Sequence, residues 1–234
     1  MINFHPFASS SRGNFYVVDD GQTKIMLDCG IPFKQIKEKL NFKTHEIEAV
    51  CLSHQHMDHS KAARDILKAG LDIYAKQETI DTLGLSGYRI HPIEANKQFN
   101  LGTWSILPFD LEHDCPNLGF LMMNRNKEKF LYVTDTYYCR YRFNDLSVIA
   151  IECNHSYDIL AANVEAGTVP VEHKNRLIRS HFSLENVKEF LKANDLSMVR
   201  EIYLIHLSSG NSDAERFKRE IQELTGKMIF VAGK

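Results

Sequence analysis

Short apolar runs bounded by turn residues recur along the chain, a pattern that is typical of β-strands. A Ser-rich turn and the tripeptide Asp19-Asp20-Gly21 separate the first three runs. Later runs such as Ile47–Leu52 and Val148–Glu152 have few polar positions, as in strands that are buried on both faces. The predicted strands are Ile2–Phe7, Phe15–Val18, Ile25–Leu27, Ile47–Leu52, Leu71–Ala75, Thr103–Phe109, Leu118–Met123, Lys129–Val133, Val148–Glu152 and Glu201–Ile205.

Helices are predicted where apolar residues recur with helical spacing or where a capping residue precedes them. Pro32 and Ser183 are such starts, and Gly70 ends a helix. The predicted helices are Pro32–Leu40, Lys61–Ala69, Glu78–Leu83, Tyr157–Gly167, Ser183–Asn194 and Asp213–Leu224. Strands dominate at first and alternate with helices later, which predicts an α/β fold in which helices cover two packed sheets. Without repeats or a Pro/Gly-rich linker, we expect a single domain over residues 1–234.

Composition narrows the class of protein. The chain has 234 residues, with 28 Lys and Arg against 30 Asp and Glu, so the formal net charge is −2. A near-neutral chain argues against binding long nucleic acid through bulk charge. Five cysteines without a Cys-x-x-Cys pair, no visible signal peptide and no apolar run of about 20 residues favour the cytoplasm over a membrane or secretion. The unusual feature is the 11 histidines.

The strongest chemical motif is Ser53-His54-Gln55-His56-Met57-Asp58-His59-Ser60, between a buried strand and a helix. In an extended segment His54 and His56 point to the same side and can share one metal ion. Asp58 and His59, where the chain turns into the helix, can face a second ion. Nitrogen and oxygen donors without thiolate favour Zn²⁺, with Mn²⁺ as an alternative. The motif therefore predicts a site for two divalent cations.

The motif His54-x-His56-x-Asp58-His59 resembles the signature of the metallo-β-lactamase superfamily, and the resemblance extends along nearly the whole chain. It implies an αββα sandwich with a dinuclear metal site at the sheet edges. Asp28 in Asp28-Cys29-Gly30 resembles the carboxylate that supports the ligands from behind. The implied metal ligands are His54, His56 and His113 on one ion, Asp58, His59 and His206 on the other, and Asp135 between them.

Two cations about 3.5–4 Å apart form a clamp for displacement at phosphorus, and each lowers the pKa of a bound water. The leaving oxygen then needs a proton. His181 and His155, which lie beside predicted element ends, are the candidates for this step, and Asp58 is a catalytic candidate as well as a ligand.

The loop Ala8–Asn14 resembles the Gly-Ser-Ser-Ser-x-Gly-Asn loop of a compact phosphodiesterase branch, with Ala8 in place of the first glycine. This branch includes tRNase Z-like enzymes, YycJ-type exonucleases and phage anti-Pycsar cyclic-nucleotide phosphodiesterases. The resemblance makes Ser10 and Asn14 candidate supports for the site. True lactamases have a cysteine where Asp135 stands, so antibiotic hydrolysis is not expected. The segments Ser180–Ser183 and His206–Asn211 are similar to both the YycJ-type and the anti-Pycsar proteins.

The near-neutral charge favours a small phosphodiester over a polymer. We therefore expect hydrolysis of 3′,5′-cyclic nucleotides to nucleoside 5′-monophosphates, in a homodimer that counteracts cyclic-nucleotide antiviral signalling, as the resemblance implies. Tyr137 and Arg140, just after Asp135, are candidates for stacking a base and steadying a phosphate. The alternatives are a metal-dependent DNA or RNA nuclease and a metal-binding protein without catalysis.

Overall fold

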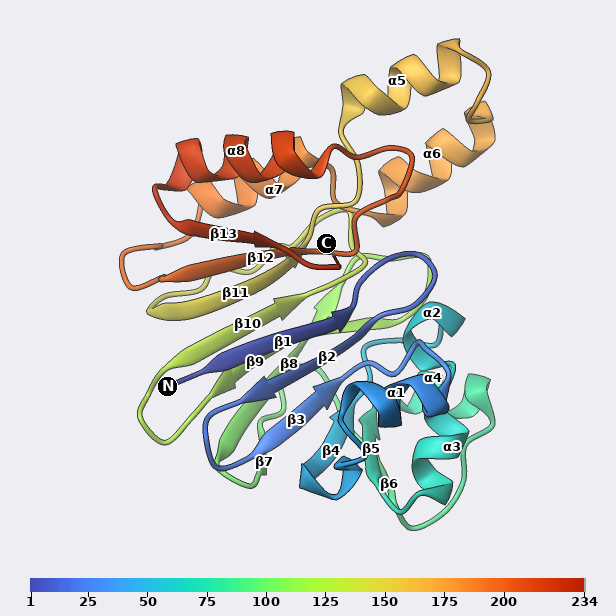
Figure 1. Cartoon of the computed structure of the whole chain (residues 1–234), viewed down its shortest axis with the longest axis vertical. Helices are drawn as coiled ribbons and strands as arrows, with labels where there is room; N and C mark the ends of the chain where they lie inside the picture. Colours follow the sequence, from blue (N-terminus) through green and yellow to red (C-terminus); the bar gives the residue numbers. More distant parts are fainter. Residues whose placement is uncertain (234) are drawn as a thin grey trace.

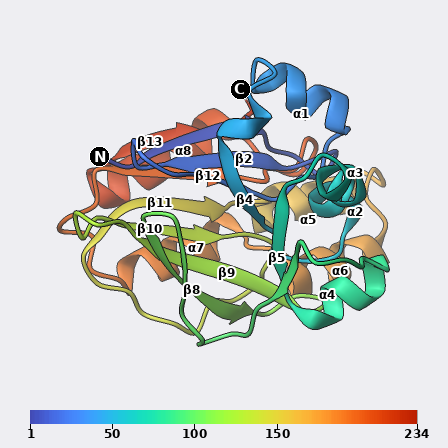
Figure 2. The same cartoon turned by 90° about the horizontal axis from the view of Figure 1, so that it is seen from below.

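Two β-sheets lie face to face in the centre of the molecule (Figures 1 and 2), and the computed structural model describes residues 1–233. One sheet has the order β1-β2-β3-β4-β5-β6 and the other β13-β12-β11-β10-β9-β8-β7. The strands are β1 (Asn3–Ala8), β2 (Phe15–Asp19), β3 (Lys24–Leu27), β4 (Ile47–Cys51), β5 (Asp72–Ala75), β6 (Ile90–Pro92), β7 (Phe99–Leu101), β8 (Trp104–Leu111), β9 (Asn117–Met123), β10 (Lys129–Val133), β11 (Leu146–Glu152), β12 (Glu201–Ile205) and β13 (Met228–Val231).

Helices cover the outer faces of both sheets, and one helical pair projects from the body (Figure 1). The helices are α1 (Phe33–Lys39), the 3₁₀ turn Thr44–Glu46, α2 (Met57–Ser60), α3 (Ala63–Lys68), α4 (Gln77–Leu83), α5 (Tyr157–Glu165), α6 (Val171–Ser180), α7 (Leu184–Lys192) and α8 (Ala214–Thr225). The projecting pair is α5 and α6, whereas α7 and α8 lie along the second sheet. Within residues 1–233 no helix is long and apolar enough to cross a membrane.

The alternation of side chains along β10 explains the layers. Phe130 and Tyr132 point between the sheets and pack with residues of β1 and β2, whereas Leu131 and Val133 point outward and pack under α7 and α8. Successive residues of a strand face opposite sides, so an all-apolar strand can serve two hydrophobic cores at once. A third core lies between the outer face of the first sheet and α1, α3 and α4.

The predicted αββα sandwich is confirmed, but several elements differ from the prediction. α6 was not expected, because its sequence is mostly polar and only Leu177 and Ser180 are buried. The four-residue edge strand β13 was also missed, because so short a run gives little periodicity. The helix expected at Lys61–Ala69 is α3, and a separate short helix, α2, precedes it and begins within the His54–His59 segment. The single domain stays a prediction.

Candidate metal centre

The candidate ligands lie where strands end, at one edge of the paired sheets. Asp28 follows β3, the His54–His59 segment follows β4, and His206 follows β12. Neighbouring strands β3 and β4 are parallel, as are β10, β11 and β12, so their carboxyl ends meet at the same edge. In open α/β sheets this is the edge at which ligands bind.

Asp28 is fully buried and holds His59 from behind. Its Oδ2 lies 2.7 Å from Nδ1 of His59 and accepts a 2.6 Å hydrogen bond from the Tyr132 hydroxyl. Its Oδ1 accepts hydrogen bonds from the backbone and side chain of Ser53. Because a carboxylate only accepts hydrogen bonds, Nδ1 of His59 carries the proton. Its Nε2 faces the cluster, a name that we use for the candidate metal ligands and the side chains that contact them. The structure thus places Asp28 where a supporting carboxylate is expected.

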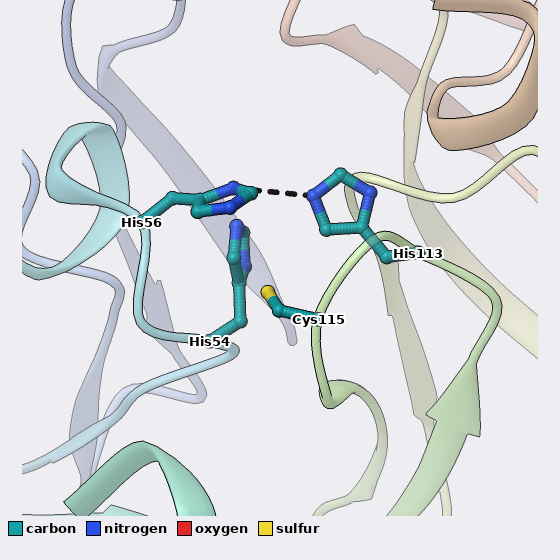
Figure 3. Close-up of side chains that lie close together, drawn as sticks. All are labelled: His54, His56, His113 and Cys115. Carbon is teal, nitrogen blue, oxygen red and sulfur yellow. Dashed lines mark hydrogen bonds between the residues drawn. The ribbon is translucent and has the colours of Figure 1, made fainter. Parts of the chain in front are cut away.

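Three imidazoles and a thiol form the first ligand group (His54, His56, His113 and Cys115), drawn in Figure 3. One ligand atom from each of these residues lies within 4.8 Å of all the others. Nε2 of His113 lies 3.2 Å from Nδ1 of His56. Burial lowers the pKa of His54 and of His113, which keeps both imidazoles neutral and free to donate a lone pair.

Two carboxylates and two imidazoles form the second ligand group (Asp58, His59, Asp135 and His206), with the same 4.8 Å limit. Nε2 of His206 is 3.1 Å from Oδ2 of Asp58, and Nε2 of His59 is 3.1 Å from Oδ1 of Asp135. Asp135 also faces the first group, because its Oδ2 lies 3.9 Å from Nε2 of His54 and 4.0 Å from Nε2 of His113. The carboxylate of Asp135 therefore stands between the two groups.

The donor set fits divalent cations. Nε2 of His54 is buried, aimed into the first group, and has no hydrogen-bond partner among residues 1–233. In the second group burial opposes protonation, yet Asp135 and the hydrogen bonds to Asp58 and Glu152 raise the pKa of His206 to about 10. The buried carboxylates thus require positive charge nearby, which cations would supply in place of these protons. Imidazole and carboxylate suit Zn²⁺ or Mn²⁺, and the identity of the ion is not fixed by them.

Glu152, which sequence reasoning missed, is the fully buried carboxylate that joins two histidines. Its Oε1 lies 2.6 Å from Nδ1 of His181 and 3.1 Å from Nδ1 of His206. Its Oε2 accepts hydrogen bonds from the backbone of Thr136 and Phe182. The available signal was a single charged residue at the end of the apolar run Val148–Ile151, where it closes β11.

The Ser-rich loop closes the cluster on the side of β1. Nδ2 of Asn14 lies 3.0 Å from Nε2 of His59 and 3.3 Å from Oδ2 of Asp58. The backbone amide of His206 donates to the Ser9 hydroxyl, whereas the hydroxyl of Ser10 accepts a local bond from the backbone amide of Arg12. Asn14 therefore contacts the candidate ligands directly, and Ser9 holds one of them instead of the expected Ser10.

His155 is not brought to the cluster. It is fully buried, and neither ring nitrogen has a hydrogen-bond partner in the part of the chain that the structure describes. Burial lowers its pKa to about 4, so the ring is neutral near pH 7. The expectation that His155 donates a proton is therefore corrected. His181, by contrast, lies beside both Glu152 and Asp135.

A cavity of about 330 Å³ opens onto the cluster and is covered in part by α6. Asp58, Asp135 and His181 line it together with His173 and Arg176 of α6. A second cavity, of about 340 Å³, is lined by Tyr137, Tyr138 and Arg142 among others. Arg140 is exposed and pairs with Glu112, and its contact with a phosphate stays a prediction.

Three residues of the cluster have left-handed backbone conformations. The φ angle is 58° at Asp28, 35° at Asp135 and 53° at His206. Residues other than glycine adopt such angles at a cost of about 1–3 kcal/mol each. The tight turns after β3, β10 and β12 thus carry strain at the positions that present these side chains to one another.

A model of the β-lactamase superfamily domain matches residues 23–207, which is more than three quarters of the chain. Exodeoxyribonuclease WalJ of Streptococcus pneumoniae is 28% identical over 225 aligned positions, which cover 89% of this chain and 82% of that protein. Exodeoxyribonuclease YycJ of Bacillus anthracis is 24% identical and covers 99% of this chain and 92% of its own length. The expected resemblance to the YycJ-type branch is confirmed.

Solved structures agree on the fold. YhfI of Bacillus subtilis, a metallo-β-lactamase fold protein, superposes with a TM-score of 0.77 at 15% identity and covers 99% of this chain and 95% of its own. The short form of human tRNase Z superposes with a TM-score of 0.66 at 14% identity, with 99% and 96% covered. At such low identity these matches establish the shared fold only.

Proposed function

The chain belongs to the metallo-β-lactamase superfamily, a metal-dependent hydrolase fold, and from this membership and the geometry of its site we propose that it is a deoxyribonuclease that removes nucleotides from a DNA end. The observation that carries the proposal is the pair of ligand groups with Asp135 between them, next to the Glu152–His181 pair. The similarity to two exodeoxyribonucleases supports DNA as the substrate.

The residues of the cluster have separate tasks in this proposal. The first and second ligand groups would hold two cations, which supply an activated water and neutralise charge on the phosphoryl oxygens. Asp28 keeps Nε2 of His59 directed at the cluster, and Glu152 does the same for His206 and His181. His181 is the residue that we assign to proton donation at the leaving oxygen, because its Nδ1 is hydrogen-bonded to Glu152 and its Nε2 has no hydrogen bond within residues 1–233.

The size of the cavity favours attack at a chain end. Small-ligand pockets span about 300–1,000 Å³, so a cavity of about 330 Å³ suits a single nucleotide rather than the middle of a duplex. The neighbouring cavity with Tyr137 and Tyr138, whose chain segment begins two residues after Asp135, offers aromatic faces on which a further base can stack.

The preference for a cyclic nucleotide over a polymer rested on the net charge of the chain. The net charge does not show which charged residues line the cavity. Arg176 of α6 lines the cavity, so a cationic group is present where a phosphate would enter even though the net charge of the chain is near zero. The cavity volume also suits a 3′,5′-cyclic nucleotide, which remains the second candidate. The homodimer and the cytoplasmic location stay predictions.

The test compares the two substrate classes directly. Protein loaded with Zn²⁺ or Mn²⁺ is incubated with single- and double-stranded DNA labelled at either end, with RNA, and with cyclic UMP, CMP, AMP and GMP. We expect labelled mononucleotide from the susceptible DNA end at the earliest times, and no activity in the Asp135→Asn variant. Internal fragments at the earliest times would contradict end-directed cleavage. Hydrolysis of a cyclic nucleotide with intact DNA would reject the nuclease in favour of the second candidate.

A further inference from the structure

Cys115 differs from the other four cysteines of the chain. Cys29, Cys51, Cys139 and Cys153 are buried and belong to the hydrophobic cores, whereas Cys115 is partly exposed in the loop between β8 and β9. It follows His113 by two residues. Its sulfur is directed toward the ring of His54 (Figure 3). A thiol so placed is part of the cluster and not of a core.

The position of the sulfur completes a set of four donors. Sγ of Cys115 and one ring nitrogen each of His54, His56 and His113 all lie within 4.8 Å of one another. Imidazole nitrogen and thiolate sulfur are both ligands that Zn²⁺ binds, so these four donors suit this ion. The His54 ring supplies an independent sign of a ligand, because its Nε2 is fully buried, points into this set and has no hydrogen-bond partner in residues 1–233.

Asp114 is the alternative to Cys115 as the fourth metal ligand, but its contacts do not favour this role. Its Oδ1 lies 3.3 Å from Nε2 of His56 and 3.2 Å from Nε2 of His113, but it does not belong to a group with His54. Its Oδ2 is bound to Arg176 of α6 at 3.1 Å. Asp114 therefore lies against two of the imidazoles, whereas Cys115 is within reach of all three.

We propose that Cys115 is a fourth protein ligand of the cation held by His54, His56 and His113. The inference rests on the metal-dependent hydrolase proposed above. The thiol releases its proton to solvent as the sulfur–metal bond forms. A thiolate makes the first ligand group selective for Zn²⁺ over Mn²⁺ and Mg²⁺, which prefer oxygen donors. The second ligand group has no sulfur, so the two groups differ in the metals that they retain.

The test detects the bond between the cysteine sulfur and the metal ion and does not depend on enzyme activity. Metal-free protein is loaded with two equivalents of Co²⁺, and the near-ultraviolet absorption is recorded, where a thiolate bound to Co²⁺ gives a charge-transfer band. We expect the band in the wild type and in the matched control Asp114→Asn, and its absence in Cys115→Ser. Competition with a chelator should show Zn²⁺ affinity reduced by at least about 10-fold in Cys115→Ser, with less change for Mn²⁺.

X-ray absorption of the Zn²⁺-loaded wild type removes any dependence on a variant that folds poorly, because it detects a sulfur scatterer at about 2.3 Å directly. A wild type that binds two cations without a sulfur scatterer and without the band overturns the proposal, as does a band that persists in Cys115→Ser. DNA hydrolysis by the same preparations decides the proposed function separately. Sulfur ligation without nuclease activity would support Cys115 and reject the nuclease.

Discussion

Nδ1 of His181 lies 2.6 Å from Oε1 of Glu152 and donates a hydrogen bond to it. Burial opposes protonation of His181, but the charge of Glu152 and this hydrogen bond raise its pKa. Nε2 of the same ring has no hydrogen bond in the described part of the chain, and the ring lines the cavity next to Asp135. The pair therefore presents an oriented imidazole that retains its proton to a higher pH than an exposed histidine.

If His181 donates the proton to the leaving oxygen, the loss in His181→Ala depends on the leaving group. We expect kcat on DNA to fall by about 10²–10⁴-fold, and kcat on bis(p-nitrophenyl) phosphate to fall much less, because nitrophenolate leaves without a proton. Metal content is measured on the same samples. Equal losses on both substrates would argue that His181 acts elsewhere in the reaction.

The buried carboxylate of Asp28 should control metal affinity through His59. In Asp28→Asn the amide cannot accept all the hydrogen bonds from His59, Ser53 and Tyr132, so the His59 ring loses its fixed tautomer. We expect metal affinity to fall by about 10–100-fold, measured by competition with a chelator. Tyr132→Phe removes one donor and keeps the carboxylate, so it should weaken affinity less. The opposite order would contradict this role.

Gly30 should tolerate no side chain. A Cβ at this position would lie 1.6 Å from the carbonyl oxygen of Asp58 and 2.7 Å from the amide nitrogen of His59. Gly30→Ala must displace that backbone, so we expect a loss of at least about 1–3 kcal/mol in the free energy of unfolding, together with lower metal content. Gly210→Ala, which enters open space, is the matched control and should stay within about 0.5 kcal/mol. Denaturant unfolding and metal analysis measure both.

Removal of the metal should lower thermal stability. A ligand at 100 times its Kd stabilises the folded state by about 2.7 kcal/mol, which for a chain of this size corresponds to about 5–10 °C in Tm. We expect EDTA to produce a fall of this order and Zn²⁺ to restore the original Tm. Binding at the cluster requires that Asp135→Asn respond less to both treatments. An unchanged Tm in the wild type would indicate that the cluster is not loaded.

His155 should contribute to acid sensitivity and not to catalysis. Its pKa is about 4 in the folded protein and about 6.5 when unfolded, so the unfolded state binds more protons between these values. Stability therefore falls as the pH drops from about 6.5 to about 4, by up to about 3 kcal/mol from this residue. His155→Leu should flatten that part of the pH profile and leave kcat unchanged. A large fall in kcat in His155→Leu would show that His155 takes part in catalysis.

Sequence reasoning reached the ligands that follow strands and missed those whose role depends on packing. The His54–His59 segment is contiguous and could be found by its pattern, whereas His206, which follows β12, was implied by the resemblance to the superfamily. Glu152 was read as the end of its strand, because its two histidine partners lie 29 and 54 residues away. Cys115 could not be predicted as a ligand, because its approach to His54 depends on how the loop between β8 and β9 folds.

The substrate was the weakest prediction for a related reason. Net charge is a sum over the chain, whereas recognition depends on the few charges that line the cavity. α6 brings the guanidinium of Arg176 there, and its polar sequence gave no signal of a helix. The fold could therefore be predicted from the periodicity of the strands, while the walls of the cavity could not.

The left-handed residues Asp28, Asp135 and His206 have a consequence for the evolution of this chain. Glycine would relieve the backbone strain at each of them, so the changes that remove the chemistry also remove the strain of these turns. A copy released from selection for catalysis would drift toward glycine or asparagine at these three turns while keeping both sheets. Among descendants of this fold, these three positions would distinguish working enzymes from proteins that have kept only the architecture.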